Sequence, residues 1–185
     1  MAHIQVIVGS TRPGRTGRKI ADWYVDGLEI PAGSTVELID LADVNLPFLD
    51  EAMPAMYGQY ANDHTKKWAE TIGKADGYVF VTPEYNHAPS PALLNAISYL
   101  SAEWKFKPVA FVGYGSIGGA RAIQVLVGSA SELNMVPVRE RVSVIEPWIS
   151  VSEDGAINAD YVKGDKNAQL AAVVNWAEAT KSLRG

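Results

Sequence analysis

Serine, threonine and arginine side chains gather among closely spaced glycines near the N-terminus, in residues 9–18 (GSTRPGRTGR). This stretch follows an apolar run and precedes an amphipathic one, so it is expected to join a strand to the start of a helix. Free backbone N–H groups and the helix dipole make such a helix end an anion site. Arg12 or Arg15 adds charge-assisted hydrogen bonds, and three arginines at the positive end of a helix are unfavourable without an anion. The stretch therefore predicts a phosphate site.

The same stretch differs by one residue from the P-loop pattern G-x-x-x-x-G-K-[ST], because Arg15 stands where that pattern has lysine. The strands expected at 77–82 and 108–113 end in Thr82 and Gly113, without an acidic residue that would hold Mg²⁺. The dinucleotide pattern G-x-G-x-x-G is absent, so Asp40 is interpreted as a strand-end residue rather than a ribose ligand. A P-loop-like phosphotransferase is kept as an alternative function.

A second segment of chemical interest is residues 82–91 (TPEYNHAPSP), in which three prolines restrict the backbone. Tyr85 lies next to Asn86, and a rigid aromatic ring beside an amide suits a flat heteroaromatic ligand with hydrogen-bonding edges. His87 has no ligand spacing to the other two histidines, so no metal site is predicted. No catalytic acid, base or nucleophile is assigned.

A third segment, residues 113–121 (GYGSIGGAR), has four glycines in its first seven residues, which is more than a turn requires. Glycine lets backbone N–H groups approach a ligand closely. We therefore expect this segment, with the helix that follows it, to face the same ligand.

The elements that must position these segments alternate along the chain. Strands are predicted at Ile4–Gly9, Thr35–Asp40, Gly77–Thr82, Pro108–Gly113 and Val136–Val144. Helices are predicted at Gly17–Gly27, His64–Lys74, Pro91–Ser101, Gly119–Leu133 and Asp165–Leu183. The core face of the last helix is expected at Leu170, Val173, Val174, Trp176 and Ala177, and Leu41–Asn62 is expected to be an irregular link.

Strands that are apolar on both faces are typical of a parallel sheet covered by helices. The predicted fold class is α/β, a flavodoxin-like doubly wound sheet of five parallel strands in the order 2-1-3-4-5, forming one domain over residues 1–185. The three polar segments then follow strands one, three and four at one edge of the sheet. Their convergence at the place where such folds bind ligands is the main functional signal.

The composition and net charge of the chain exclude several classes of protein. The chain has 185 residues, no cysteine and a net charge of −5, from 16 basic and 21 acidic residues. An acidic chain is a poor candidate for a nucleic-acid binder, and zero cysteine excludes disulfides and a cysteine nucleophile. No apolar run approaches 18 residues and the N-terminus lacks signal-peptide features, so we expect a cytoplasmic protein without a membrane span.

The three segments together resemble the NADPH-dependent FMN reductase family, the flavodoxin-like group that also contains quinone, azo-dye and chromate reductases. The resemblance depends on residues 9–12 (GSTR), 83–86 (PEYN), 94–97 (LNAI) and 118–121 (GGAR), and it extends from Ile4 to about Val144. The PEYN box followed by Asn-Ala-Ile is its specific part. Two positions depart from many members: Thr16 stands at a serine position, and Ser98-Tyr99 stand where Asp-Trp is common.

The resemblance implies a site for FMN. It implies that the phosphate binds at Ser10, Arg12, Thr16 and Gly17, with Arg15 beside them, and that the ring and ribityl chain contact Pro83, Glu84, Tyr85 and Asn86. It also implies that the backbone around Ser116, Gly118 and Gly119 meets the flavin ring.

The implied activity passes hydride from NADPH or NADH through FMN to a quinone, azo or flavin acceptor. A flavodoxin-type electron carrier without substrate turnover is a further alternative. The resemblance also implies a homodimer or homotetramer, and the apolar link Leu41–Asn62 supports an oligomer because such a segment is not expected to lie bare on a monomer.

Overall fold

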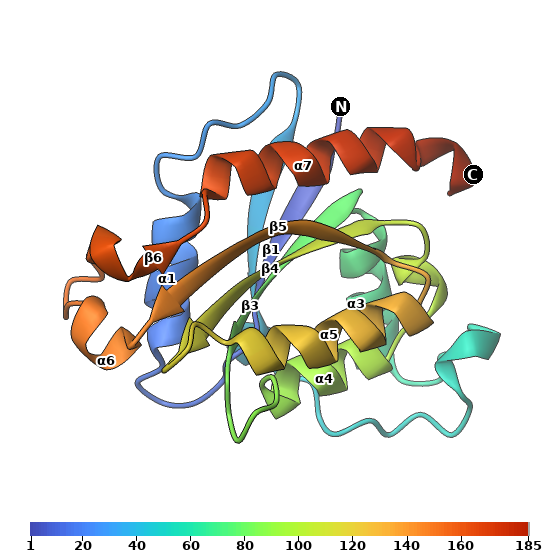
Figure 1. Cartoon of the computed structure of the whole chain (residues 1–185). Helices are drawn as coiled ribbons and strands as arrows, with labels where there is room; N and C mark the ends of the chain where they lie inside the picture. Colours follow the sequence, from blue (N-terminus) through green and yellow to red (C-terminus); the bar gives the residue numbers. More distant parts are fainter. Residues whose placement is uncertain (185) are drawn as a thin grey trace.

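Alternating apolar and amphipathic runs produce one mixed sheet between two layers of helices in the computed structural model, which describes residues 1–184 (Figure 1). The strands are β1 (His3–Val8), β2 (Thr35–Asp40), β3 (Gly77–Pro83), β4 (Pro108–Gly115), β5 (Val136–Ile145) and β6 (Val162–Lys163). Their order in the sheet is β2-β1-β3-β4-β5-β6. The first five are parallel, as the continuous apolar runs predicted, whereas β6 pairs antiparallel with β5.

The sheet is flavodoxin-like, with the predicted order of its five long strands confirmed and one two-residue strand added. Every residue of β3 is buried, and so are the first seven of the eight residues of β4. Burial on both faces is what a central parallel strand requires, because helices cover the two sides. The added β6 lies in residues 146–164, to which the sequence patterns assigned no element.

Helices cover both faces of the sheet (Figure 1). The first layer holds α1 (Thr16–Val25) and α7 (Lys166–Ala179), which pack Tyr24 and Leu170 onto β1, β3, β4 and β5. The second layer holds α3 (Asp63–Gly73), α4 (Pro91–Ser98) and α5 (Ala120–Glu132). Here Trp68 and Trp104 are fully buried against Phe80. Both apolar faces of the sheet are thereby removed from water, the main favourable contribution to folding.

Several predicted boundaries are corrected. The helix expected at Pro91–Ser101 ends at Ser98 and is followed by the 3-10 turn η2 (Ala102–Trp104). The helix expected at Asp165–Leu183 is α7 followed by the 3-10 turn η4 (Lys181–Leu183), and Trp176 is 47% exposed rather than part of the core face. The link Leu41–Asn62 is not wholly irregular, because it contains α2 (Leu41–Val44) and η1 (Ala55–Tyr57).

The carboxyl ends of the parallel strands lie at the lower left of the molecule, where the chain adds the short helix α6 (Pro147–Ser150) after β5 (Figure 1). The 3-10 turn η3 (Ala159–Tyr161) then leads into β6. In residues 1–184 no helix is long and apolar enough to cross a membrane.

Candidate active site

A cavity of about 280 Å³ opens at the carboxyl ends of β1, β3 and β4. Residues from four segments line it, namely Ser10, Arg12, Arg15, Thr16, Pro83, Glu84, Tyr85, Tyr114, Gly115, Pro147 and Trp148. The three segments singled out in the sequence therefore meet, as the sheet order requires. A fourth contribution comes from α6, which follows β5.

One end of the cavity is suited to an anion. The helix α1 starts there with no side-chain cap and no acidic residue in its first turn, so its first backbone N–H groups are free to bind a ligand. Ser10 and Thr16 bring hydroxyl groups to the same wall, and Ser10 is only 1% exposed. Gly17 is buried in the first helical turn, where a Cβ would collide with the hydroxyl of Tyr114. A larger residue at this position would have to displace the ring of Tyr114 from the cavity wall.

The three arginines of this segment differ in their partners, which corrects part of the sequence argument. Arg15 Nη2 donates to Asp40 Oδ2 at 2.6 Å, and the side chain of Asp40 is only 2% exposed. Arg18 Nε donates to Asp22 Oδ1 at 2.9 Å, and this hydrogen bond is the largest cause of the raised pKa of Arg18. Two of the three charges are thus neutralised within the chain and need no external anion.

Arg12 is the exception. Within residues 1–184 it forms no salt bridge and no hydrogen bond through its side chain, and it lines the cavity. Arg15 also has an unused donor, because its Nε is buried without a hydrogen-bond partner. A buried donor left unpaired costs free energy, so an acceptor oxygen in the cavity next to Arg15 would be stabilising.

The segment after β3 is a tight hairpin. Tyr85 and Ala88 exchange backbone hydrogen bonds of 2.8 and 2.9 Å, with Asn86 and His87 between them at φ of 50° and 66°. Positive φ at both central positions is the primed turn that suits a two-residue hairpin. Tyr85 is held over the cavity, where its hydroxyl lies 2.9 Å from Ser10 Oγ. Asn86 is exposed at the tip and does not line the cavity.

Glu84 is directed at the start of α5. Its Oε2 accepts from the backbone N–H of Arg121 at 3.0 Å, and its Oε1 accepts from Arg121 Nη1 at 2.8 Å. Burial raises the pKa of Glu84, but the hydrogen bonds and charge of Arg121 outweigh it, so the pKa lies below its ordinary value. The carboxylate therefore occupies the helix end that the sequence argument left open for a ligand.

The backbone conformation at Gly118 and Gly119, which follow β4, explains why these residues are glycine. Gly118 and Gly119 have φ of 70° and 73°, and a Cβ on Gly119 would lie 2.7 Å from the backbone nitrogen of Tyr114. Neither residue lines the cavity, whereas Gly115 does. Ser116 is exposed. Contact of this backbone with a flavin ring stays a prediction.

Sequence reasoning did not identify Tyr114, Pro147 and Trp148 as lining residues. Tyr114 is buried, and burial raises its pKa above the ordinary range, so its hydroxyl is protonated at neutral pH. The position of Trp148 in the sequence could have identified it, because Trp148 closely follows the fifth strand. That strand ends at the same edge of the sheet from which the other three segments extend. A planar ligand with a phosphate fits this arrangement, because free helix N–H groups and Arg12 offer donors to a phosphate and the aromatic rings of Tyr85, Tyr114 and Trp148 line the same cavity.

Comparisons with known proteins identify the family of the chain. The family model for NADPH-dependent FMN reductase matches residues 2–148. An NAD(P)H-dependent FMN reductase of Nectria sp is 35% identical over 98% of this chain and 90% of its own length. A quinone reductase of Pseudomonas putida is 26% identical over 97% of both chains.

Among solved structures, the flavoenzyme FerB of Paracoccus denitrificans, an NAD(P)H:(acceptor) oxidoreductase, superposes with a TM-score of 0.66. The match covers 97% of this chain and 99% of that one at 22% identity. At this identity the likeness supports the fold.

Proposed function

The chain belongs to the NADPH-dependent FMN reductase family, and from that premise we propose that the cavity between Arg12, Tyr85 and Trp148 is its FMN site. The chain is an FMN-dependent oxidoreductase that uses NAD(P)H. FMN, when bound, supplies the hydride and electron transfer chemistry, which no side chain of the cavity provides. What the residues contribute is binding, orientation and electrostatics.

The single observation that carries the placement is the set of unused donors at one end of the cavity. Among residues 1–184, the N-terminus of α1 has no side-chain cap, Arg12 has no ionic partner, and Arg15 Nε is buried and unpaired. All of these are cationic or N–H groups, and a phosphate monoester supplies several acceptor oxygens in one place. The residues present therefore fit the phosphate of FMN.

The aromatic side chains that line the cavity suit the flavin ring. Tyr85 is fixed by its hairpin and by the hydroxyl contact with Ser10, and Tyr114 forms part of the adjacent wall. The Glu84–Arg121 pair ties the hairpin after β3 to α5, so the two loops beside the ring keep a constant spacing. Hydride transfer depends on alignment of the reacting rings, and these contacts provide a rigid frame for it.

Binding is tested by titrating the apoprotein with FMN and with FAD while flavin fluorescence is recorded. We expect stoichiometric quenching by FMN and much weaker binding of FAD, because one helix N-terminus serves one phosphate. A protein that quenches neither flavin would contradict the proposal. Oxidation of NADPH by the FMN-loaded protein in the presence of a quinone distinguishes a reductase from an electron carrier without turnover.

We propose that the acceptor is a quinone, an azo compound or a free flavin. The Pseudomonas putida relative is named for its action on quinones, which favours the first of these. Rates with benzoquinone, methyl red and free FMN at equal NADPH concentration rank the three.

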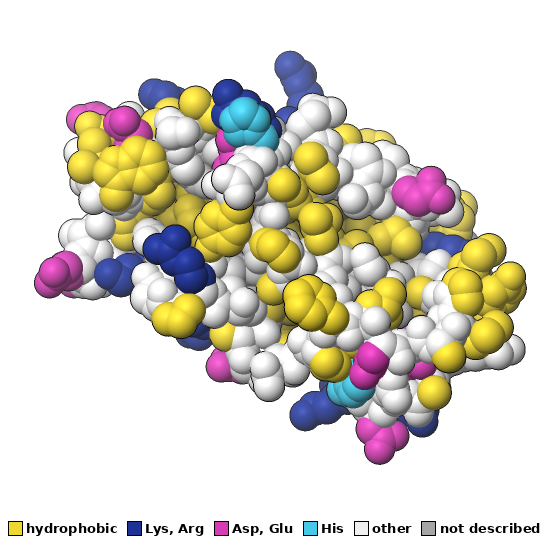
Figure 2. Space-filling model, turned by 90° about the horizontal axis from the view of Figure 1, so that it is seen from below, with side chains coloured by type: hydrophobic (Ala, Val, Ile, Leu, Met, Phe, Trp, Pro, Cys, Tyr) yellow, Lys and Arg dark blue, Asp and Glu magenta, His cyan; other side chains and the backbone are white. Residues whose placement is uncertain are grey.

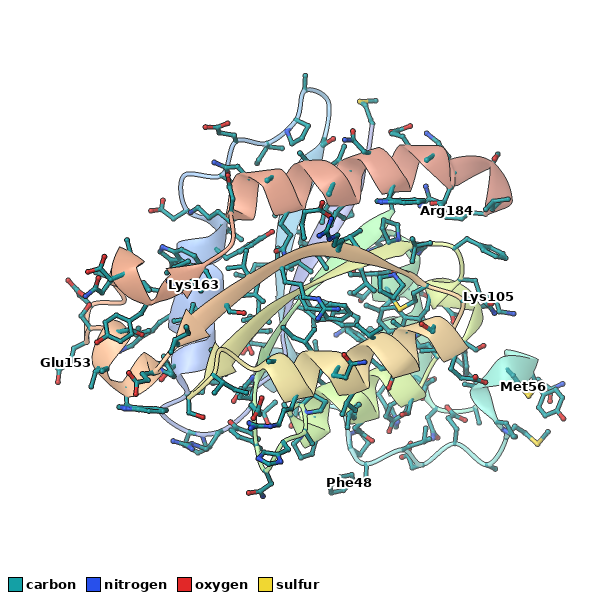
Figure 3. The ribbon with its side chains drawn as sticks, viewed as in Figure 1. Phe48, Met56, Lys105, Glu153, Lys163 and Arg184 are labelled. Carbon is teal, nitrogen blue, oxygen red and sulfur yellow. The ribbon has the colours of Figure 1, made fainter. Side chains whose placement is uncertain are left out.

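We also propose a homodimer or homotetramer. Within the segment 45–60, Phe48 is 84% exposed and Met56 is 72% exposed, and both point away from the rest of the chain (Figure 3). Leu46 and Tyr60 instead pack inside their own chain. Hydrophobic side chains are spread across this face of the molecule with few charged groups between them (Figure 2). Light scattering that gives 20.0 kDa at micromolar concentration would refute association.

We also propose a domain organisation and a cellular location for the chain. Residues 1–185 form one domain, which limited proteolysis tests through the absence of a stable shorter fragment. The protein is cytoplasmic, which cell fractionation tests.

A further inference from the structure

Asp40 is a buried carboxylate that the proposed function leaves without a role. It is the last residue of β2, and its side chain is only 2% exposed. It does not line the cavity of about 280 Å³. A buried charge is costly unless it is paired and hydrogen-bonded. The groups that face Asp40 therefore indicate what it does.

Among residues 1–184, three groups near the starts of α1 and α2 face the Asp40 carboxylate. Oδ1 accepts from the backbone N–H of Ala42 at 3.0 Å, which caps α2. Oδ2 accepts from Arg15 Nη2 at 2.6 Å and from Arg18 Nη1 at 3.5 Å. Arg18 is the weaker partner, because its Nε donates to both carboxylate oxygens of Asp22 at 2.9 and 3.1 Å. Arg15 is therefore the main cation that neutralises Asp40.

Arg15 connects Asp40 to the cavity. It is the N-cap residue of α1 and lines the cavity beside Arg12 and Thr16. Its Nη2 is used by Asp40, whereas Nε and Nη1 donate to no acceptor within residues 1–184. A guanidinium holds its five N–H donors in one rigid plane, so fixing Nη2 also fixes the direction of the others. The hydrogen bond to Asp40 thus leaves oriented donors for an acceptor in the cavity.

The burial of Asp40 decides between two effects that its carboxylate could have on anion binding. A carboxylate that competes with a phosphate for Arg15 would weaken binding, whereas one that orients Arg15 would strengthen it. Competition requires the pair to break, which would leave a carboxylate of 2% exposure without its closest cation, at a cost in free energy. Orientation breaks no contact, because Arg15 can bond to Asp40 and to a phosphate through different nitrogens.

We propose that Asp40 is a positioning residue for the cofactor phosphate, which holds the guanidinium of Arg15 with its unused donors available to the phosphate of FMN. This inference rests on the proposed function. Because the Arg15–Asp40 pair is neutral, Arg15 supplies directed hydrogen bonds, while Arg12 supplies the unpaired charge. Without Asp40, the long side chain of Arg15 has to be ordered when the phosphate binds, which lowers the affinity.

The test compares the binding of FMN with that of riboflavin, which lacks the phosphate, by fluorescence titration of the apoprotein. The variant is Asp40→Asn, which leaves no unpaired carboxylate and still offers an acceptor to Ala42. An amide has one oxygen, so it cannot offer a separate oxygen to Ala42 and to Arg15. Asp43→Asn is the matched control, because it also removes one negative charge, but Asp43 is exposed and neither pairs with Arg15 nor lines the cavity.

We expect Asp40→Asn to lower FMN affinity by about 2–10-fold, the cost of ordering one released arginine side chain, while riboflavin affinity stays unchanged. Asp43→Asn should leave both affinities at their wild-type values. Arg15→Lys keeps a cation beside Asp40 but lacks the planar fork of donors, so it should lower FMN affinity by a similar factor. Adding Asp40→Asn to Arg15→Lys should cause no further loss, because Asp40 acts through the guanidinium.

An FMN affinity that rises or stays unchanged in Asp40→Asn overturns the inference, because the carboxylate would then compete with the phosphate or have no effect on it. Equal losses for FMN and riboflavin overturn it as well, since they would show general damage to the cavity. So does a double variant that loses as much again as Asp40→Asn alone, because Asp40 would then act independently of Arg15. These outcomes leave the proposed function standing, which fails on a separate result: a wild-type protein that does not bind FMN.

Discussion

Arg12 gives the sharpest test of the phosphate site, because it is the one arginine of residues 9–18 whose charge has no partner among residues 1–184. Removing it by Arg12→Ala deletes a charge-assisted hydrogen bond to the phosphate, worth roughly 1.5–3 kcal/mol. At 1.4 kcal/mol for each factor of ten, FMN affinity should fall about 10–150-fold. The melting temperature of the apoprotein should not change, since no contact inside the chain is lost.

The neighbouring arginines are the controls. Arg18→Ala removes an exposed pair with Asp22, which contributes about 0.3–0.5 kcal/mol to a helix, and it should leave FMN affinity nearly unchanged. Arg15→Ala leaves the buried carboxylate of Asp40 without its closest partner. It should therefore destabilise the apoprotein, by less than the about 3–5 kcal/mol of a fully unpaired buried charge, because Arg18 Nη1 and the backbone N–H of Ala42 still face Asp40 at 3.5 and 3.0 Å.

The assay is fluorescence titration of each apoprotein with FMN, paired with thermal unfolding of the same samples. Equal losses of FMN affinity in Arg12→Ala and Arg18→Ala would refute the reasoning, because they would show that the arginines act as a diffuse positive field. An Arg12→Ala apoprotein with a lower melting temperature would also refute it, since Arg12 would then have a structural contact.

The remaining predictions concern stability and potential. Glu84→Gln removes a negative charge beside the cavity, so the reduction potential of bound FMN should rise. The same change weakens the contact with the N-terminus of α5, so the unfolding free energy should fall by about 1 kcal/mol. An unchanged potential in a titration against a redox dye contradicts this prediction. Gly119→Ala should lower the melting temperature, because residue 119 has a φ of 73° and an added Cβ would collide with the backbone nitrogen of Tyr114. Activity should fall in proportion to the fraction of folded protein. Burial lowers the pKa of Lys107 from 10.5 to about 8, so between these pH values the unfolded chain holds more protons at this group, and its contribution to stability should rise with pH by up to about 3 kcal/mol. Tyrosines whose pKa values burial raises act in the opposite direction near pH 10, so the measured quantity is the difference in unfolding free energy between the wild type and Lys107→Met. This difference should change between pH 8 and pH 10.5, whereas the difference for the exposed control Lys105→Met should stay constant.

The fold was largely predictable because the signals that specify it are local. The apolar runs at β3 and β4 are buried on both faces, so composition alone marks them as central strands. Helix ends were less accurate, as in α4, which ends at Ser98 where a 3-10 turn takes over. Residues 146–164 carried no strong periodicity, and β6 exists only because β5 offers it an edge to pair with.

The candidate site was predictable at the level of loops and not at the level of contacts. Sequence order and sheet order together bring Ser10, Pro83 and Tyr85 to one edge of the sheet. Arg12 and Arg15 looked equivalent in the sequence, yet Arg15 bonds to Asp40 because β2 ends beside the start of α1.

By itself, the sequence determined the strands and helices, their alternation along the chain, and the edge of the sheet at which the polar segments meet. Each of these depends on residues close together in the chain and on the rules that govern how parallel strands are connected. The tertiary structure decided the individual partners. Glu84 reaches Arg121 across 37 positions, and the left-handed turn at Glu146 brings Trp148 to the cavity. Such contacts depend on distances of a few ångströms between segments remote in sequence, and no periodicity or composition within one segment specifies them.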